Sequence, residues 1–531
     1  MPRGVPQRRL AQSTTIPAPV GGINAVNAAT AMPVGDAYDL VNMIGGSRGL
    51  VSRLGFSEWC IGMSSNPVRS VLSFAGSSSA ADKLFACTNT AIFDCTISSQ
   101  TPSSVHTFAT SDGDSGTGGF TTYATSAGHF GLYCDESNGF LLYTQSTGLW
   151  TTIAQGSAAG QINGVNPALF VGVLSWKNRV WFVQKATARA WYLPVGQITG
   201  TVTVFDFGNK FPHGGTLIGL YSWTRDGGDG IDDYLVAVSS AGDVLVYRGT
   251  DPATSGAFEN VGAYFIGAIP TGRRIASELG GELLIASLEG VFPLSRLLTG
   301  TIGPALYTTQ KIQSLFHTYA KDRKSIAGWF MQVSPEENCL LVNMPQTGNT
   351  SEQFAMSLSS GGWSIFQDRP ALSSAVWHGA LFCGTWDGRL YKVSGDLDDV
   401  KLSGAATYDE IDVRLLTSFQ SLGSIRRKQI QEIRPRMISQ GAAPGYGVEA
   451  RYDFDSSTIS ATPSDPSTEG IAVWDTAVWD TDVWPGVDTP VGDRRGATGS
   501  GVHMAVAFRG RVNARLTLMG FDVTWTEGGI F

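Results

Sequence analysis

A short turn followed by a strand-like run of aliphatic and aromatic residues recurs along the middle of this 531-residue chain. The recurring turns lie near positions 91, 139, 190, 242, 290, 339 and 388, so neighbouring copies are 48 to 52 residues apart. Four short strands and their turns need roughly 50 residues, which is the size of a β-propeller blade. The repeat therefore predicts an all-β fold containing a β-propeller, with a sandwich or a solenoid as the alternative.

Each recurring turn is expected to join the second and third strands of a blade. A second apolar run precedes most of the turns, as in Lys83–Cys87 and Asp233–Val238, and is expected to form the second strand. The number of turns predicts seven blades. Six blades is the alternative, because the last unit is short and could complete an earlier blade.

The two ends of the chain do not follow the repeat. Residues 1–66 contain several prolines and glycines and little periodicity, which is typical of an extended arm lying on a surface. The propeller is therefore expected over residues 67–399. Residues 400–531 contain further strand-like runs, interrupted by a linker over residues 456–467 that is rich in Pro, Ser, Thr and Asp. These residues predict a separate C-terminal β-sandwich-like domain.

The charge content limits the classes of function. Charged residues make up 15% of the chain, against about 25% in ordinary soluble domains, which suggests a surface partly covered by partner subunits. The formal net charge of −8 argues against a DNA-binding protein that reads sequence, since such proteins present a basic face. An acidic wall past which DNA slides fits this charge, as does an ordinary acidic soluble protein.

No motif indicates catalysis or a cofactor. Gly113–Gly116 has the letters of a serine-protease nucleophile loop, but the only preceding histidine is His106, nine residues away. Gly45–Gly49 matches a nucleophile elbow without a convincing helix after it, so a tight turn is expected. The acidic loop Asp226–Asp233 does not have the spacing of a calcium loop, and a solvated loop is the favoured interpretation. We therefore expect no enzyme, no cofactor and no metal.

Cysteine usage and hydropathy indicate a protein made in the cytoplasm. The six cysteines include no Cys-x-x-Cys pair, and free thiols in a reducing compartment are the simplest interpretation. The longest apolar run, Ala168–Trp176, is far shorter than the ~20 residues that span a bilayer. No membrane-spanning segment is expected.

Two short segments are candidates for contacts with partners. Trp474, Trp479 and Trp484 recur every five residues, and each can bury roughly 150–250 Å². They are expected either to anchor a neighbouring subunit or to pack within the C-terminal domain. The basic cluster formed by Arg426, Arg427 and Lys428 could contact DNA phosphate or an acidic partner, and a solvated hairpin end is the alternative.

The order of several short motifs resembles a family of bacteriophage proteins. The motifs near the N-terminus are Pro19–Asn24, Met32–Ala37, Leu40–Asn42 and Arg53–Phe56, and those near the C-terminus are the tryptophan-rich ribbon and Glu527–Phe531. In this order they resemble the tail nozzle (tail tube) proteins of short-tailed, podovirus-type bacteriophages. One departure is Asn42-Met43-Ile44, where the family often has Asn-Trp-Phe.

The resemblance implies a structural virion protein. It implies a β-propeller assembled as a homohexameric ring below the portal and adaptor rings, which lengthens the DNA channel and gates its exit. It also implies tail fibres or spikes on the outside, DNA passing through the lumen without sequence reading, and a location in the virion tail. The alternatives are a propeller that binds or cleaves glycans and a cellular scaffold propeller.

Overall fold

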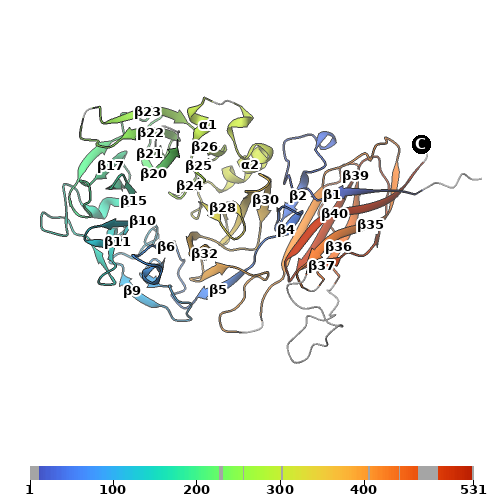
Figure 1. Cartoon of the computed structure of the whole chain (residues 1–531), viewed down its shortest axis with the longest axis horizontal. Coiled ribbons are helices and arrows are strands. Elements are labelled where there is room, and N and C mark those ends of the chain that lie inside the picture. Colours follow the sequence, from blue (N-terminus) through green and yellow to red (C-terminus); the bar gives the residue numbers. More distant parts are fainter. Residues whose placement is uncertain are drawn as a thin grey trace, which may run out of the picture.

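The structure, a computed structural model, describes residues 11–226, 231–254, 256–300, 303–404, 407–441, 443–464 and 488–528. It is all-β, with 49% strand and 6% helix. A propeller forms one end of the molecule and a pair of packed sheets forms the other (Figure 1). The predicted fold class, a β-propeller with a sheet-rich C-terminal region, is confirmed.

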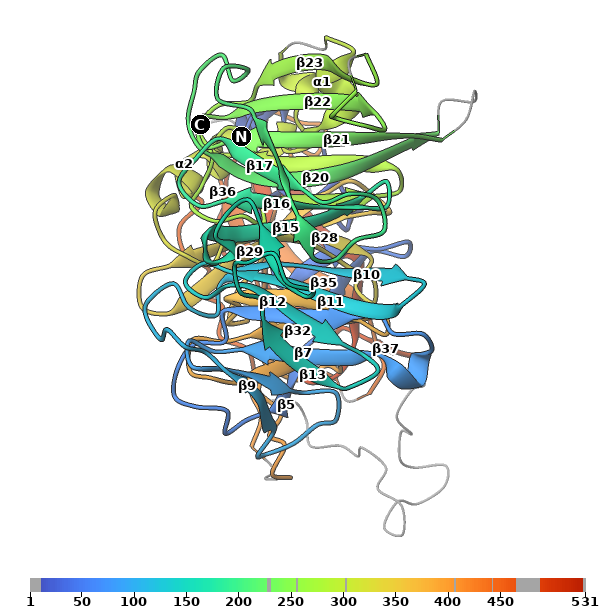
Figure 2. The same cartoon turned by 90° about the vertical axis from the view of Figure 1, so that its left-hand side faces the viewer.

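The propeller of the described chain contains six four-stranded blades and one three-stranded blade. Their order around the ring is the order of the chain (Figure 1), and Figure 2 shows the propeller from its side. β31 of the last blade packs on β6 of the first. Blades 1 to 4 are β6–β9 (Ser70–Phe74, Lys83–Cys87, Ala91–Asp94, Ser103–Thr107), β10–β13 (Gly118–Thr125, Gly128–Asp135, Gly139–Thr144, Leu149–Thr152), β15, β16, β17 and β19 (Phe170–Trp176, Arg179–Gln184, Arg189–Tyr192, Thr203–Asp206), and β20–β23 (Leu217–Asp226, Ile231–Ser239, Asp243–Gly249, Phe258–Phe265). Blades 5 to 7 are β24–β26 (Ala276–Leu279, Glu282–Ser287, Gly290–Pro293), β27–β30 (Phe330–Ser334, Cys339–Gln346, Thr350–Ser357, Trp363–Phe366), and β31–β33 with β5 (Ser373–Trp377, Ala380–Gly384, Leu390–Val393, Phe56–Cys60).

Further short elements lie in the N-terminal segment, within blades and between blades. They are η1 (Ala29–Ala31), η2 (Ser79–Ala81), β14 (Ile162–Asn163), η3 (Pro167–Leu169), β18 (Gly200–Thr201), α1 (Leu294–Leu298), η4 (Pro304–Leu306), η5 (Gln310–Ile312) and α2 (Gln313–Arg323). None of the described helices is long and apolar enough to cross a membrane.

Neighbouring blades are held together by separate apolar clusters. Between blades 1 and 2, for example, Phe74 and Phe85 pack on Tyr143 with ring centroids 4.9 and 5.1 Å apart. Similar clusters fill the following interfaces. The apolar runs of the sequence form middle strands such as β7, β12, β25 and β26, which are buried on both faces. This arrangement lets a long chain fold without one large core.

Six of the seven predicted turns precede or begin the third strand of a blade, and the one at position 339 was wrong. Cys339 begins β28, the second strand of blade 6, and the third strand begins at Thr350. The segment between β26 and β27 contains α1, η4, η5 and α2, so blade 6 starts later than the repeat predicts. The regular spacing at this position is a coincidence of segment lengths.

The N-terminal segment is built into both ends of the molecule. β1 (Gln12–Pro17) pairs with the C-terminal strand β40, and β2 (Ala37–Val41) lies between β30 of blade 6 and β34. β3 (Met43–Gly45) and β4 (Leu50–Ser52) form a hairpin beside β40. β5, which the sequence analysis placed in the arm, is the outer strand of blade 7 and closes the ring.

The C-terminal region forms two packed sheets. One contains β3, β4, β40, β35 and β37, with β1 and β38 at its sides, and the other extends blade 6 through β2, β34, β39 and β36. The additional strands are β34 (Ile411–Thr417), β35 (Lys428–Ser439), β36 (Gly445–Tyr452), β37 (Thr489–Val491), β38 (Arg495–Gly496), β39 (Met504–Val512) and β40 (Leu516–Glu527).

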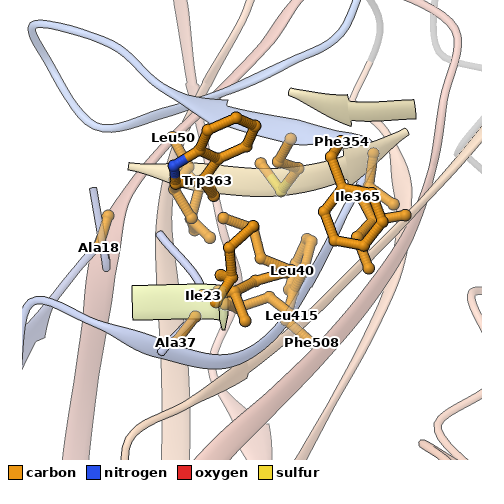
Figure 3. Packing of buried hydrophobic residues seen from close by; sticks show 14 of the residues in the cluster. Ala18, Ile23, Ala37, Leu40, Leu50, Phe354, Trp363, Ile365, Leu415 and Phe508 are labelled. Carbon is orange, nitrogen blue, oxygen red and sulfur yellow. The ribbon is translucent and has the colours of Figure 1, made fainter. Parts of the chain in front are cut away.

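One buried cluster joins this region to the propeller. It contains side chains from the N-terminal segment, from blade 6 and from the C-terminal strands (Figure 3). Leu40, Trp363 and Phe508 represent the three groups, and each is at most 1% exposed. The region is sandwich-like as expected, but through β2 it shares a continuous sheet with the propeller.

We expect Phe56→Ala to destabilise the whole propeller. Phe56 is 4% exposed, lies opposite Val393 in the closing strand pair and packs on Tyr391 at 4.7 Å between ring centroids. Truncating a buried phenylalanine costs about 3–5 kcal/mol, so denaturant unfolding should show a loss of that size. The control is Leu169→Ala, because Leu169 is 39% exposed. Equal stability of the two variants would contradict the closing role of β5.

Candidate functional site

Two adjoining cavities lie on the propeller axis. The first has a volume of about 490 Å³ and is lined by residues from the innermost strand of every blade. These include Leu72, Phe120, Val173, Leu220, Ala276, Met331 and Ala375. The second has a volume of about 480 Å³. Both cavities are lined by Gly118, Ile218, Arg273 and Arg274. They are therefore two parts of one axial space, and these four residues lie where the parts meet.

Arg274 extends across the axis from the segment that precedes β24. Its guanidinium donates to the carbonyl oxygens of Arg69 at 3.0 Å and of Gly118 at 3.2 Å, and to the hydroxyl of Ser70. These acceptors belong to blades 1 and 2 and are all uncharged. Desolvation by burial lowers the pKa of Arg274, although an arginine stays charged at any physiological pH.

Arg273 makes the corresponding contacts on the other side. It donates to the carboxylate of Glu136, which lies in the turn between β11 and β12 of blade 2, and to the carbonyl oxygen of Ile218 in blade 4. The two arginines therefore connect blade 5 to blades 1, 2 and 4. Side chains cross the axis, so the propeller itself provides no path for a DNA duplex.

Arg69 also lines the second cavity, but in the described chain it lacks side-chain hydrogen bonds like those of Arg273 and Arg274. Its Nε is buried and has no hydrogen-bond acceptor among the described residues. Arg69, Arg273 and Arg274 are the basic residues of this cavity, and Asp114 and Glu136 are its acidic ones. The second cavity therefore has an excess of positive formal charge.

The motif Gly113–Gly116 beside this cavity forms a structural turn. The Ser115 hydroxyl is buried and donates to the Thr110 carbonyl oxygen at 2.8 Å and to the Asp112 carboxylate at 3.0 Å. Hydrogen bonds from Ser137 and from the backbone of Asp114 hold the pKa of Asp112 below its usual range. No histidine is bonded to Ser115 in the described chain, and the geometry is that of a turn without a catalytic base.

Two buried ion pairs lie where the N-terminal segment meets the last two blades. The Arg53 side chain is 0% exposed and donates to both carboxylate oxygens of Asp398, at 2.7 and 2.6 Å. It also donates to the side-chain oxygen of Asn42 and to the carbonyl oxygens of Leu54 and Gln367, each at 2.9 Å. All the donors of this buried guanidinium are thereby used, as burial of a charge requires.

The second pair is formed by Arg369 and Glu337. Arg369 donates to the two Glu337 oxygens at 2.7 and 3.1 Å and to the Leu54 carbonyl oxygen at 2.7 Å. Glu337 in turn accepts from the Leu54 backbone amide at 3.0 Å. Desolvation raises the pKa of Glu337, but the charge and hydrogen bonds of Arg369 outweigh it, so this pKa lies below its ordinary value.

The N-terminal motifs of the phage resemblance lie in or beside this buried framework. Gly55 approaches the Leu397 carbonyl oxygen so closely that a Cβ would lie 1.9 Å from it. Gly22 adopts φ +77°, and a Cβ there would collide with the Trp363 backbone. Asn24 and Asp36 are buried and joined by a 2.7 Å hydrogen bond. In the sequence these residues stand out only as parts of short motifs, and the structure shows that they fasten the N-terminal segment.

A carboxylate-rich cleft lies between blade 7 and the C-terminal strands. It has a volume of about 660 Å³, and its charged lining residues are Asp368, Asp398, Asp399, Asp409, Glu410, Asp412, Arg389, Arg509 and Arg511. Arg509 binds Asp412 through two 3.0 Å contacts, and Arg389 contacts Asp399 at 2.9 Å. Burial raises the pKa of Asp368, and Asp398 and Asp412 raise it further while Arg53 opposes them. Among the described residues no His, Cys, Asp or Glu cluster is placed to hold a metal ion.

The predicted contact residues are only partly described. Trp474, Trp479 and Trp484 lie outside the described residues, as does the tip of the Asp226–Asp233 loop. The side chains of Arg426 and Arg427 are exposed at the turn before β35.

Lys428 is not available to DNA or to a partner. It is fully buried, and its ammonium donates to the carbonyl oxygens of Ser424, Arg426 and Val502. Its prediction as a contact was wrong, because its charge is used to hold together the turn that presents its two neighbours.

Comparison with known proteins finds similarity to solved structures but no matching family. No protein-family model matches the chain, and neither does any curated protein. The chain is similar to the computationally designed Ika8 protein, with a TM-score of 0.35 and 10% identity over 64% of this chain and 99% of that chain.

A second similarity is to the extracellular domain of a hybrid two-component system from B. thetaiotaomicron. Its TM-score is 0.39 and its identity is 12%, over 67% of this chain and 45% of that chain. This chain thus spans less than half the length of that domain. Both TM-scores are below 0.5, so neither structure supports a conclusion about function.

The ion pair of Glu337 predicts a specific loss of stability in acid. Because its pKa is lowered on folding, the pair contributes stability above the ordinary glutamate pKa of about 4.3 and loses it as the pH falls through the lowered value. We expect Glu337→Gln to cost about 3–5 kcal/mol at neutral pH and to flatten the decline of unfolding free energy below about pH 5.

Denaturant unfolding at a series of pH values measures both effects. Glu259→Gln is the matched control, since Glu259 is 54% exposed. The double variant Glu337→Met with Arg369→Met keeps the test possible if the single variant does not fold, because removing both charges leaves neither unpaired. A steep acid decline in the double variant, equal to that of the wild type, would contradict the assignment.

Proposed function

We propose that this chain is a structural virion protein that forms the nozzle of a short-tailed bacteriophage tail. The observation that carries the proposal is the position of the motifs that resemble the nozzle family. Gly22, Asn24, Asp36, Arg53 and Gly55 fasten the N-terminal segment to blade 6, to blade 7 and to the C-terminal sheets. Motifs with this structural role support a shared scaffold, which a chance resemblance on an exposed surface would not.

The architecture suits a mechanical role. Blade 6 and the C-terminal strands share one sheet through β2, so a force on one end of the subunit is transmitted to the other by backbone hydrogen bonds. In the proposed assembly six copies surround a common lumen, below the portal and adaptor rings and with fibres or spikes outside. DNA then passes between the copies, because Arg273 and Arg274 cross the axis of each propeller.

The exposed basic turn is a candidate contact in such an assembly. Arg426 and Arg427 lie beside Ile425, whose side chain is 87% exposed. Arg426 is 3.6 Å from Glu527, and Arg427 donates to the Ser500 carbonyl oxygen at 3.1 Å. A protruding turn with one apolar and two basic side chains fits an acidic partner surface or a DNA backbone.

A glycan-processing propeller is the second candidate, and one feature favours it. Asp368 lines the carboxylate cleft with a raised pKa, and a glycosidase needs a protonated acid beside a second, ionised carboxylate. The cleft lies between blade 7 and the C-terminal strands rather than in the axial cavities. Its other carboxylates are largely held by Arg53, Arg389 and Arg509, so we place this function second.

Quantitative mass spectrometry of purified phage particles tests the proposal. A closed sixfold ring below a portal of twice that symmetry predicts about one copy of this chain for every two portal chains. Residual host proteins in the same sample provide the background abundance for comparison. Absence of the chain from the particles, or only background amounts, would contradict the nozzle and would move the glycan-processing propeller to first place.

A further inference from the structure

The second axial cavity is lined by more basic than acidic groups, and its acidic groups are not free to balance them. Glu136 is bound to Arg273, and Lys185 lies 3.9 Å from the same carboxylate. Asp114 is 70% exposed and lies 3.9 Å from Lys185. Neither carboxylate forms an ion pair with Arg69 or with Arg274 in the described chain.

Arg69 differs from its two neighbours in its hydrogen bonds. The donors of Arg273 and Arg274 are directed at carbonyl, hydroxyl and carboxylate oxygens of the surrounding blades. The Nε of Arg69 is buried and has no hydrogen-bond partner among the described residues. A buried donor without an acceptor costs about 1–3 kcal/mol, more when it is charged, and is rare in native proteins.

The rest of the lining suits a small anion. Thr117, Thr216 and Ser240 provide hydroxyl groups, and Leu217 and Trp329 provide apolar walls. A volume of about 480 Å³ lies within the range of small-molecule sites, which combine apolar walls with a few polar groups. The planar guanidinium presents parallel N–H donors that match two oxygens of a carboxylate or a phosphate.

We propose that the second axial cavity binds a small oxyanion, a phosphate or a carboxylate, through the guanidinium of Arg69. The anion balances the charges of Arg69 and Arg274. A hydrogen bond to the carbonyl oxygen of Arg69 holds the Arg274 side chain in place. This proposal does not depend on the role in a phage tail, because it rests only on the lining of the propeller axis.

Calorimetric titration of the full chain with inorganic phosphate and, separately, with citrate tests the proposal. Sodium chloride at matched ionic strength is the reference for unspecific salt effects. We expect saturable binding of at least one of the two anions and a Kd at least about tenfold weaker in Arg69→Gln, the loss expected for a hydrogen bond to a charged group. Phosphate binding alone would identify a phosphoryl ligand, and citrate binding alone a carboxylate ligand.

Two further variants make the result specific. Arg189→Gln is the matched control, because Arg189 lies in β17, is 52% exposed and pairs with Asp206; it should bind like the wild type. Arg69→Lys keeps the charge but not the parallel donors, so intermediate binding is expected.

Two results would overturn the proposal. One is the absence of saturable binding of either anion to the wild type. The other is a folded Arg69→Gln variant, verified by circular dichroism and by its Tm without anion, that binds with the wild-type Kd. Removing an unsatisfied buried donor leaves no native bond broken, so this variant is expected to fold.

Discussion

The buried ion pairs of Arg53 with Asp398 and of Arg369 with Glu337 are the constraint on which the rest of the structure depends. Both guanidinium groups donate to the carbonyl oxygen of Leu54, so one residue of the N-terminal segment is fixed by two charges. The position of Leu54 determines where β5 begins and closes the propeller. It also determines where β2, β3 and β4 join the C-terminal sheets. A buried pair adds little net stability, but losing one partner leaves a charge uncompensated, so the geometry is strongly specified.

This constraint explains why the molecule does not separate into a propeller with appended parts. The N-terminal segment pairs with the C-terminal strand β40, lies within the sheet extended from blade 6, and then forms the last strand of the ring. A chain built this way resists being pulled apart between its ends, which suits the proposed role in a phage tail. The axial arginines have a separate consequence, because they close each propeller to DNA and leave a small, positively charged cavity.

Much of the fold could be predicted from the sequence, because each blade uses the same short strands and turns. Period-two and fully apolar strands bounded by glycine and asparagine turns are local signals, and they placed the third strands of six blades correctly. The insert containing α2 lies between blades and has no such period, so position 339 was assigned to the wrong hairpin. The role of β5 is a pairing between Phe56 and Val393, more than 300 residues apart, which no local pattern reveals. Arg53 and Lys428 look like surface residues in sequence, and only the tertiary structure shows that their charges are buried. Arg69, Arg273 and Arg274 stand in no recognisable motif, and they come together only when the ring closes.

The central claim is that the N-terminal segment, the propeller and the C-terminal sheets form one cooperative unit. Pulse-labelling hydrogen exchange with mass spectrometry, performed across a urea series, measures an unfolding midpoint for each peptide separately. We expect one common midpoint for peptides from β7, β28 and β40, because the ion pairs and the shared sheet connect them. Clearly separate midpoints for the propeller and the C-terminal strands would show two independent units and would contradict the claim.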